Sequence, residues 1–254
     1  MTREPSGGVQ SVGRAFLLLE TLKDHGGQAG LSELAAASSL SLPTIHRLLR
    51  TLVELGYVRQ LPSRRYSLGP ALIPLGEQTT RLLGTWALPV LERLEQAAHE
   101  TANLALLDGD MVVYVAQVPS RHQMRMFTEV GRRVLPHSTG VGKALLAGLP
   151  TDQVIGIVRR TGMPRFTANT IGDEEQLLAD LAEIRERGYS IDEGEQEVGV
   201  RCFAIAIPGA VTPSAVSVSG PSARITLESA EWMLPALRTA ALELADALRT
   251  PHRG

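Results

Sequence analysis

The chain has 254 residues, 44% of them hydrophobic and 20% charged, and its formal net charge at pH 7 is −2. These values describe a globular protein with one large domain or two ordinary ones, and they give no overall signature of nucleic-acid binding. The single cysteine excludes an intrachain disulfide, the first ten residues lack the apolar core of a signal peptide, and no apolar run approaches the roughly 18–20 residues of a membrane span. We therefore expect a cytoplasmic protein that does not enter a membrane.

Charge is unevenly distributed along the chain. Residues 1–70 carry 8 Lys and Arg against 5 Asp and Glu, a net of +3, whereas residues 71–254 carry 17 against 22, a net of −5. A mildly basic first part on an acidic body fits a DNA-binding module joined to a second domain.

The first predicted element is an amphipathic helix over residues 9–25. Its apolar set recurs at helical spacing and consists of Val12, Ala15, Phe16, Leu18, Leu19 and Leu22. Two further helical patterns fill residues 31–56. We expect Ser32 to cap the first of them and Ser41 to cap the second, with Gly56 as its C-terminal stop. The buried stripe of the second helix is predicted to be Ile45, Leu48, Leu49, Leu52 and Val53.

The opposite face of the second helix is short, polar and basic. A helix with such a face suits the DNA major groove, although a solvated face in an ordinary helical hairpin would look the same. The next residues favour DNA, because strands at 57–59 and 66–68 flank a basic turn and complete a winged helix-turn-helix order. The predicted DNA-binding residues are Ser41, Pro43, Thr44, His46, Arg47 and Arg50 on the helix, and Arg64 and Arg65 on the wing.

The remaining pattern predicts a connector helix over residues 71–83 and then an α+β domain. Strands are expected at 103–107, 111–117, 123–128, 188–192, 200–207 and 214–219. Helices are expected at 86–101, about 141–149, 151–160, 173–187 and 228–248. Asp108, Gly109 and Asp110 form a strong hairpin signal between the first two strands.

The first stretch with candidate chemistry is the glycine-containing loop at residues 137–143. Backbone N–H groups at the start of a helix can hold an anion such as a carboxylate. The loop is not a Walker A sequence, since His137 and Ala144 stand where Gly and Ser or Thr are required. A tight turn that merely uses glycine is the structural alternative.

Three further candidates lie on the later strands. The acidic cluster at residues 192–197 shows no metal-ligand spacing and reads by default as a solvated loop, with Asp192 as its best functional member. Cys202 lies in an apolar strand, where a cysteine is usually a small buried residue; a catalytic role would need a base such as His137 or His122. Ser217 and Ser219 share a strand face and could bind a carboxylate, but no nucleophile elbow surrounds them.

Taken together, these segments resemble the IclR family of bacterial transcription regulators. SVGRAFLLLETL, LSELAAASSLSLPTIHRLLRTLVELGYV and RRYSLGP match its DNA-binding domain. LPHSTGVGKALLAGLP, YSIDEGEQEVGVRCFAIAIP and AVSVSGP match its effector domain. The resemblance implies a winged helix-turn-helix domain at 9–70, a connector helix at 71–83 and a GAF-like α/β effector domain at 84–250.

The resemblance also implies a pocket for a small organic acid. Its polar end would use Thr139, Gly140, Val141, Asp192, Cys202, Ser217 and Ser219, and its apolar wall Met126, Val134 and Val200. The loop would give N–H groups to the carboxylate. Asp192 would bind a ligand hydroxyl, or a carboxylate if protonated or bridged.

The leading hypothesis is a regulator that binds a double-stranded operator as a homodimer or homotetramer, without cofactor, metal or catalytic residues. One competing hypothesis is an enzyme with an accessory helix-turn-helix that uses Cys202 or Asp192. The other is an interaction module whose winged helix binds a protein.

Overall fold

The structure, a computed structural model, describes residues 9–126 and 129–249. The chain divides into two compact units between Thr79 and Thr80, inside helix α4 (Leu72–Leu83). None of the described helices is long and apolar enough to cross a lipid bilayer.

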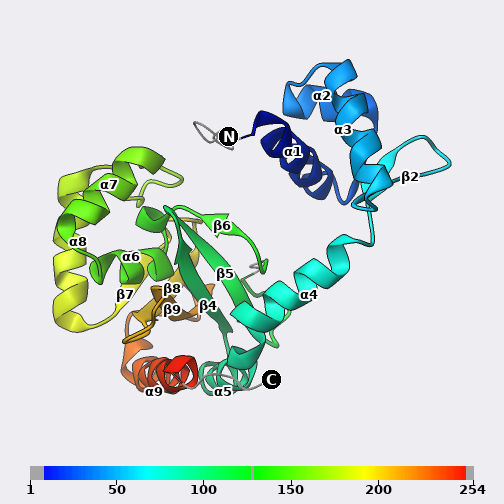
Figure 1. Ribbon diagram of the computed structural model, residues 1–254. Coiled ribbons are helices and arrows are strands. Elements are labelled where there is room, and N and C mark those ends of the chain that lie inside the picture. The colour runs from blue at the N-terminus through cyan, green and yellow to red at the C-terminus, as the bar shows by residue number, and fades with distance from the viewer. Residues whose placement is uncertain (1–8, 127–128, 250–254) are drawn as a thin grey trace. The chain divides into compact units, whose positions relative to one another are not determined.

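The N-terminal unit has the predicted winged helix-turn-helix order (Figure 1). Its helices are α1 (Gln10–Asp24), α2 (Leu31–Ser38) and α3 (Leu42–Glu54). Its strands are β1 (Gln28–Ala29), β2 (Val58–Gln60) and β3 (Tyr66–Leu68), which pair antiparallel in the order β1-β3-β2. The β2–β3 hairpin is the wing.

Helix α1 packs through a narrower stripe than predicted. Leu18 and Leu22 are fully buried, but Val12 is 52% and Phe16 is 60% exposed. At 3.6 residues per turn, Phe16 projects about 160° away from Leu18 and so faces away from the core. On α3 the stripe is confirmed except for Val53, which is 37% exposed.

Helix capping also differs from the prediction. Helix α2 starts one residue before Ser32, with Gly30 as its N-cap, and the Gly30 N–H donates to Oε2 of Glu33 over 2.6 Å. Ser41 is the N-cap residue of α3 as expected, but its hydroxyl pairs with that of Thr44 at 2.9 Å and caps no N–H. Gly56 follows the helix end with φ +78°, as expected of a stop that requires a left-handed residue.

The C-terminal unit is a six-stranded antiparallel sheet in the order β6-β5-β4-β9-β8-β7. The strands are β4 (Thr101–Asp108), β5 (Met111–Val118), β6 (Arg133–Val134), β7 (Ser190–Glu193), β8 (Val200–Ala206) and β9 (Ser214–Pro221). The helices are η1 (Thr85–Ala87), α5 (Leu88–Ala98), η2 (Pro136–Ser138), α6 (Gly140–Ala147), α7 (Thr151–Thr161), α8 (Glu174–Arg187) and α9 (Ala230–Arg249).

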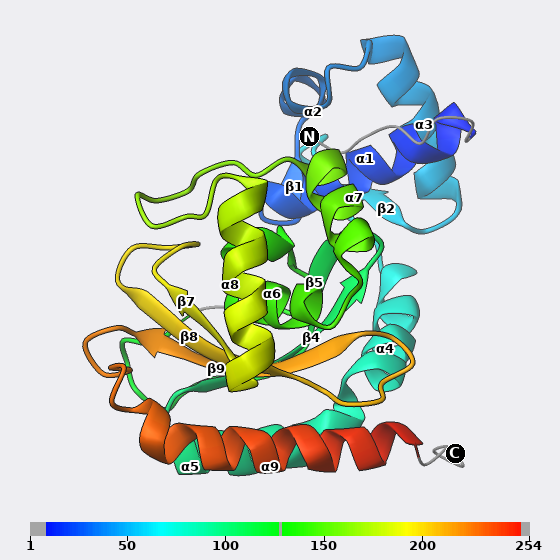
Figure 2. The same ribbon diagram turned by 90° about the vertical axis from the view of Figure 1, so that its left-hand side faces the viewer.

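Alternation along the strands gives the sheet two different faces. One face carries Leu104, Phe203 and Val218 and packs on α5 and α9, which lie side by side in Figure 1. The other face carries Ala105 and Cys202 and packs on α6, with α7 and α8 outside it (Figure 2). The second face carries the candidate site.

The predicted strand at 123–128 is wrong for residues 123–126, and residues 127–128 lie outside the described part of the chain. This backbone bonds to side chains instead of to a ladder: Oγ1 of Thr101 donates to the Met126 carbonyl over 3.3 Å, and Arg224 donates to the Met124 carbonyl over 2.8 Å. The third strand of that edge is β6, where Val134 pairs with Val112 of β5.

Candidate functional sites

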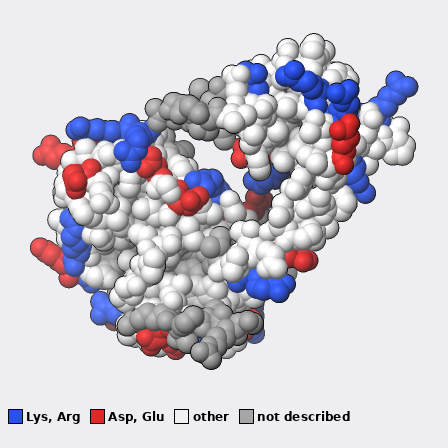
Figure 3. Space-filling model, in the orientation of Figure 1, with Lys and Arg blue, Asp and Glu red and all other residues white. Residues whose placement is uncertain are grey.

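The polar face of α3 is presented as the sequence predicts. Ser41, Pro43, His46, Arg47 and Arg50 are exposed, and Thr44 is half-buried. Figure 3 shows Lys and Arg side chains gathered over the N-terminal unit. Arg50 lies 4.0 Å from Glu54 at the surface, an ion pair too weak to withhold it from another anion.

A groove runs between α3 and the wing. Its volume is about 570 Å³, and it is lined by His46, Arg47, Arg50, Val53, Glu54, Gln60 and Tyr66. Three of these seven side chains carry basic groups. The groove therefore offers a basic surface beside the helix face that is expected to enter DNA.

The two wing arginines are placed differently. Arg64 is exposed at the tip of the hairpin, with φ +62°. Arg65 turns back, so that its Nη2 lies 2.9 Å from Oε2 of Glu33 and 3.3 Å from the Gln28 carbonyl. The Arg65–Glu33 contact joins the wing to the start of α2, so Arg65 has a structural role that the sequence did not indicate.

On the second face of the sheet, the candidate residues of three strands fall into one polar patch. Asp192 of β7 pairs with Cys202 of β8, and Cys202 pairs with Ser219 of β9. Ser217 lies two residues along the same face and pairs with Asn103 of β4. All five side chains are buried.

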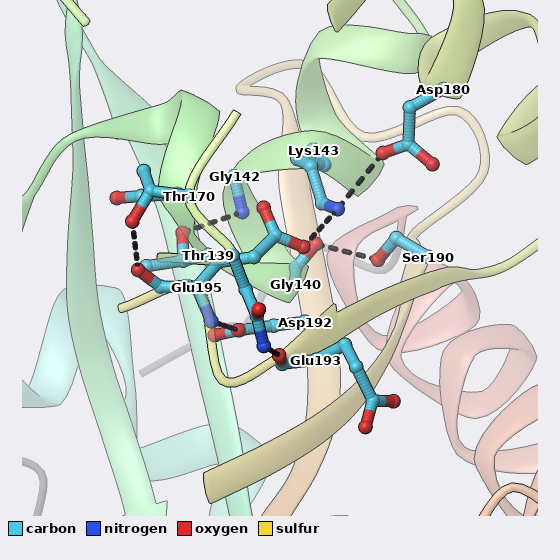
Figure 4. A network of polar contacts seen from close by, with 12 residues as sticks. Thr139, Gly140, Gly142, Lys143, Thr170, Asp180, Ser190, Asp192, Glu193 and Glu195 are labelled. Carbon is cyan, nitrogen blue, oxygen red and sulfur yellow. Dashed lines mark hydrogen bonds and ion pairs between the residues drawn. The ribbon is translucent and has the colours of Figure 1, made fainter. Parts of the chain in front are cut away.

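The loop before α6 lies against this patch (Figure 4). Thr139 caps the helix, because its Oγ1 accepts the Gly142 N–H over 3.1 Å. A Cβ on Gly140 would lie only 2.9 Å from Sγ of Cys202, so only glycine allows this close approach without a shift. The first-turn N–H groups of Gly140 and Val141 have no partner within the helix and point out of its N-terminus, where an anion is stabilised.

Of the expected apolar wall, Val134 is buried, whereas Met126 and Val200 are half-buried. The Val141 side chain is fully buried in the cluster that also holds Val134, so it contributes packing and its N–H is the group left for a ligand. Met126 is half-buried and bonded through its carbonyl to Thr101. Val200 is half-buried at the start of β8.

The acidic cluster is not the solvated loop that its composition suggested. Asp192 and Glu195 are each only 4% exposed, while Glu193 forms an ion pair with Arg201. Oδ1 of Asp192 accepts the Glu195 N–H over 2.7 Å, which turns the loop back over the strand end. The prediction of a solvated loop is therefore wrong for Asp192 and Glu195.

The α7–α8 loop holds the acidic loop in place. Thr167 donates to the Gly194 carbonyl over 2.7 Å, Thr170 to the Glu195 carbonyl over 2.6 Å, and Asn169 to the Glu193 carbonyl over 2.8 Å. Sequence spacing gave no sign of this clamp, since its partners lie about 25 residues apart.

Lys143 supplies the counter-charge for the buried carboxyls. Its Nζ lies 2.5 Å from Oε1 of Glu195 and 2.8 Å from Oδ2 of Asp180 (Figure 4). Burial raises the pKa of Asp192 to about 6 and that of Glu195 to about 7, against the opposing attraction of Lys143. Sequence reasoning missed Lys143, Asp180 and Glu195; a lysine within an otherwise apolar helical run was the available signal.

Cys202 is not arranged as a nucleophile. Burial raises the pKa of its thiol, which disfavours the reactive thiolate. Nε2 of His137, the base suggested by the sequence, lies 3.1 Å from the Pro164 carbonyl. Within residues 9–126 and 129–249, no group of three or more His, Cys, Asp or Glu side chains could hold a metal ion.

Comparison with known protein families covers both units. Residues 11–62 match the family described as the IclR helix-turn-helix domain, and residues 80–246 match the C-terminal domain of bacterial transcriptional regulator IclR.

Individual proteins are similar over most of their length. The transcriptional repressor IclR of Escherichia coli K12 is 35% identical over 89% of this chain and 85% of its own. The HTH-type regulator KdgR of Dickeya chrysanthemi is 34% identical over 94% of this chain and 80% of its own.

Solved structures give the same result. A putative transcriptional regulator from Rhodococcus sp. RHA1 is 34% identical over 95% of this chain and 98% of its own, with a TM-score of 0.80. An IclR homologue from Microbacterium hydrocarbonoxydans, complexed with 4-hydroxybenzoate, is 25% identical over 94% of this chain and 99% of its own, with a TM-score of 0.81.

Proposed function

The chain belongs to the IclR family of bacterial transcription regulators, and we propose that it binds an operator through α3 and the wing under the control of a small carboxylic acid. The observation that carries the DNA-binding part is the exposed basic face of α3 within a matched IclR helix-turn-helix domain. Thr44, Arg47 and Arg50 contact base edges in the major groove, and Arg64 contacts phosphate or the minor groove.

The effector binds on the second face of the C-terminal sheet. Its carboxylate accepts hydrogen bonds from the N–H groups of Gly140 and Val141 and from the hydroxyls of Ser217 and Ser219. Asp192 accepts a hydrogen bond from a hydroxyl of the ligand at the other end of the patch. The relative that was crystallised with 4-hydroxybenzoate supports this chemistry, because that ligand carries a carboxylate and a hydroxyl.

The proposed division is a DNA-binding domain at 9–70, a connector at 71–83 and an effector domain at 84–250. The protein acts as a homodimer or homotetramer, so that paired α3 helices read a roughly palindromic operator. An effector changes operator affinity only if it binds two arrangements of the protein with different affinities. The buried thiol of Cys202, with its raised pKa, supports a regulator over an enzyme that would use Cys202 as its nucleophile.

The test begins with the wild-type protein and labelled DNA from upstream of its own gene, compared with a scrambled duplex over a range of salt concentrations. Specific binding that weakens with salt is expected. Arg47→Ala should weaken specific binding about 5- to 150-fold, the range of one bidentate base contact, without a change in folding. Equal affinity for both duplexes at every salt concentration would contradict the proposal.

The effector is tested with 4-hydroxybenzoate, pyruvate and gluconate, which represent an aromatic acid, a keto acid and a sugar acid. At least one should bind and change operator affinity, and Ser219→Ala should raise its Kd without changing operator affinity in the absence of acid. If DNA binds and none of the acids does, the operator part stands and the carboxylate effector is contradicted.

A further inference from the structure

A buried amide stands behind the two serines of the proposed effector site. Nδ2 of Asn103 lies 3.0 Å from Oγ of Ser219 and 3.3 Å from Oγ of Ser217. On its other side, Oδ1 of Asn103 accepts from Nε2 of Gln117 over 3.0 Å. Gln117 of β5, Asn103 of β4 and the serines of β9 thus form one chain of hydrogen bonds across three strands.

This chain has a direction. An amide nitrogen can only donate and an amide oxygen can only accept. The Gln117 nitrogen donates to Oδ1 of Asn103, which leaves Nδ2 of Asn103 facing the serines. Because Asn103 donates to both serine oxygens, neither hydroxyl hydrogen is used in that contact. Each serine O–H is therefore left to donate in another direction.

We propose that Asn103 and Gln117 are positioning residues that hold Ser217 and Ser219 as paired hydrogen-bond donors, and so make the effector site select a carboxylate over its neutral amide. This inference rests on the proposed function of the site. A carboxylate accepts hydrogen bonds through both oxygens. An amide has only one accepting oxygen, and its NH2 group would face a serine hydroxyl that also donates. Two donors on one face therefore favour the acid.

Neighbouring groups support this direction. Asn103, Ser217 and Ser219 are buried, so bulk water does not compete for their hydrogen bonds. The hydroxyl of Thr101, on the same face, is already committed, because it donates to the Met126 carbonyl and accepts the Ser120 N–H.

The inference predicts the effect of reversing the amide. In Asn103→Asp the carboxylate accepts from both serines, so their hydrogens turn away from the ligand. In Gln117→Glu the new carboxylate accepts from Asn103, which turns its own oxygen toward the serines, although residue 117 does not touch them. Each variant should weaken binding of the acid that the wild type binds by roughly tenfold or more, with little change for the matching amide.

The probes are 4-hydroxybenzoate, pyruvate and gluconate with their amides, titrated into the full-length protein by calorimetry. Gln117→Met removes the N–H group that donates to Oδ1 of Asn103, but it does not require Asn103 to donate in return. It should therefore lower the preference for the acid less than Gln117→Glu does. Gln153→Glu adds the same charge on the exposed surface of α7 and should leave the preference unchanged.

A double-mutant cycle separates direction from charge. Ser219→Ala should cost the wild type a large part of its acid affinity, but should cost Asn103→Asp almost none, because the hydroxyl already points at the new carboxylate. If Ser219→Ala has the same fold effect in both backgrounds, the added charge alone explains the loss and the inference is wrong.

Neutron diffraction from crystals of the deuterated wild-type protein tests the inference without any ligand. Deuterium on the Asn103 atom that faces the serines, with both serine deuterons directed away from it, is the expected result. Serine deuterons directed at Asn103 would overturn the inference even if an acid binds. The expected deuterons with no acid bound would leave the hydrogen-bond direction standing and contradict the carboxylate effector instead.

Discussion

Nζ of Lys143 lies 2.5 Å from Oε1 of Glu195, and both side chains are buried. The contact joins α6, whose first turn borders the proposed effector site, to the loop that follows Asp192. The other oxygen of Glu195 is buried and has no hydrogen-bond partner within the described residues. A buried carboxyl in this position depends on Lys143 for its charge compensation.

Replacement of Lys143 by Met should destabilise the C-terminal unit by about 3–5 kcal/mol, because it leaves Glu195 without its buried counter-charge. Both tryptophans, Trp86 and Trp232, lie in this unit, so urea unfolding followed by tryptophan fluorescence reports on it. Lys23→Met, at an exposed position in the N-terminal unit, is the matched control and should change this transition very little. A similar small change for both variants would show that the Lys143–Glu195 pair contributes nothing to the stability of the C-terminal unit.

Stability of the C-terminal unit should fall as the pH rises from about 5 to 8. The pKa of Asp192 is raised from 3.8 to about 6 and that of Glu195 from 4.5 to about 7, so the folded state binds more protons than the unfolded state in this window. This contribution to stability is greatest at a pH below the unfolded-state pKa values and is lost as the pH rises through the folded-state pKa values. Asp192→Asn should reduce the difference between urea unfolding at pH 5 and at pH 8 by on the order of 1 kcal/mol. If the unfolding free energy of Asp192→Asn changed with pH as much as that of the wild type, Asp192 would be excluded as a source of the pH dependence.

Gly140→Ala should destabilise the C-terminal unit by about 1–3 kcal/mol, because its Cβ would lie 2.9 Å from Sγ of Cys202. Cys202→Ala removes that sulfur, so the double variant should be more stable than the sum of the two single effects by about 0.5–2 kcal/mol. Gly148→Ala at the other end of α6 meets only ordinary contact, at 3.5 Å, and serves as the control. Strict additivity in thermal unfolding would show that the two positions do not compete for space.

The two wing arginines should behave differently in DNA binding. Arg64→Ala should weaken binding to specific and scrambled duplexes alike and lower the slope of log K against log salt by about 1, as expected for one lost phosphate contact. Arg65→Ala should change the slope less, because that side chain is held by Glu33. It should also destabilise the N-terminal unit by at most about 1 kcal/mol, because both partners are partly exposed. If Arg65→Ala changed the slope more than Arg64→Ala does, Arg65 and not Arg64 would be the residue that contacts phosphate.

Where local spacing decides a structure, the sequence was sufficient. The turn at Asp108–Asp110, the stripe from Ile45 to Leu52 and the stop at Gly56 follow from residues within a few positions of one another. The errors fell where a neighbour far along the chain decides. Phe16 fits a helical spacing but faces outward, and the apolar residues near 124 form no strand because their carbonyls are bonded by Thr101 and Arg224.

The sequence by itself determined the family, the winged helix-turn-helix order and the basic face of α3, because these depend on residue types at short spacing. Tertiary structure alone decided which polar groups share one buried environment. Lys143 and Glu195 are 52 residues apart, and Asn103 and Ser219 are 116 residues apart. No periodicity links such positions. Their hydrogen bonds form because burial leaves a charged or polar group no water to bind, so the fold must supply a partner from wherever the sheet and helices bring one.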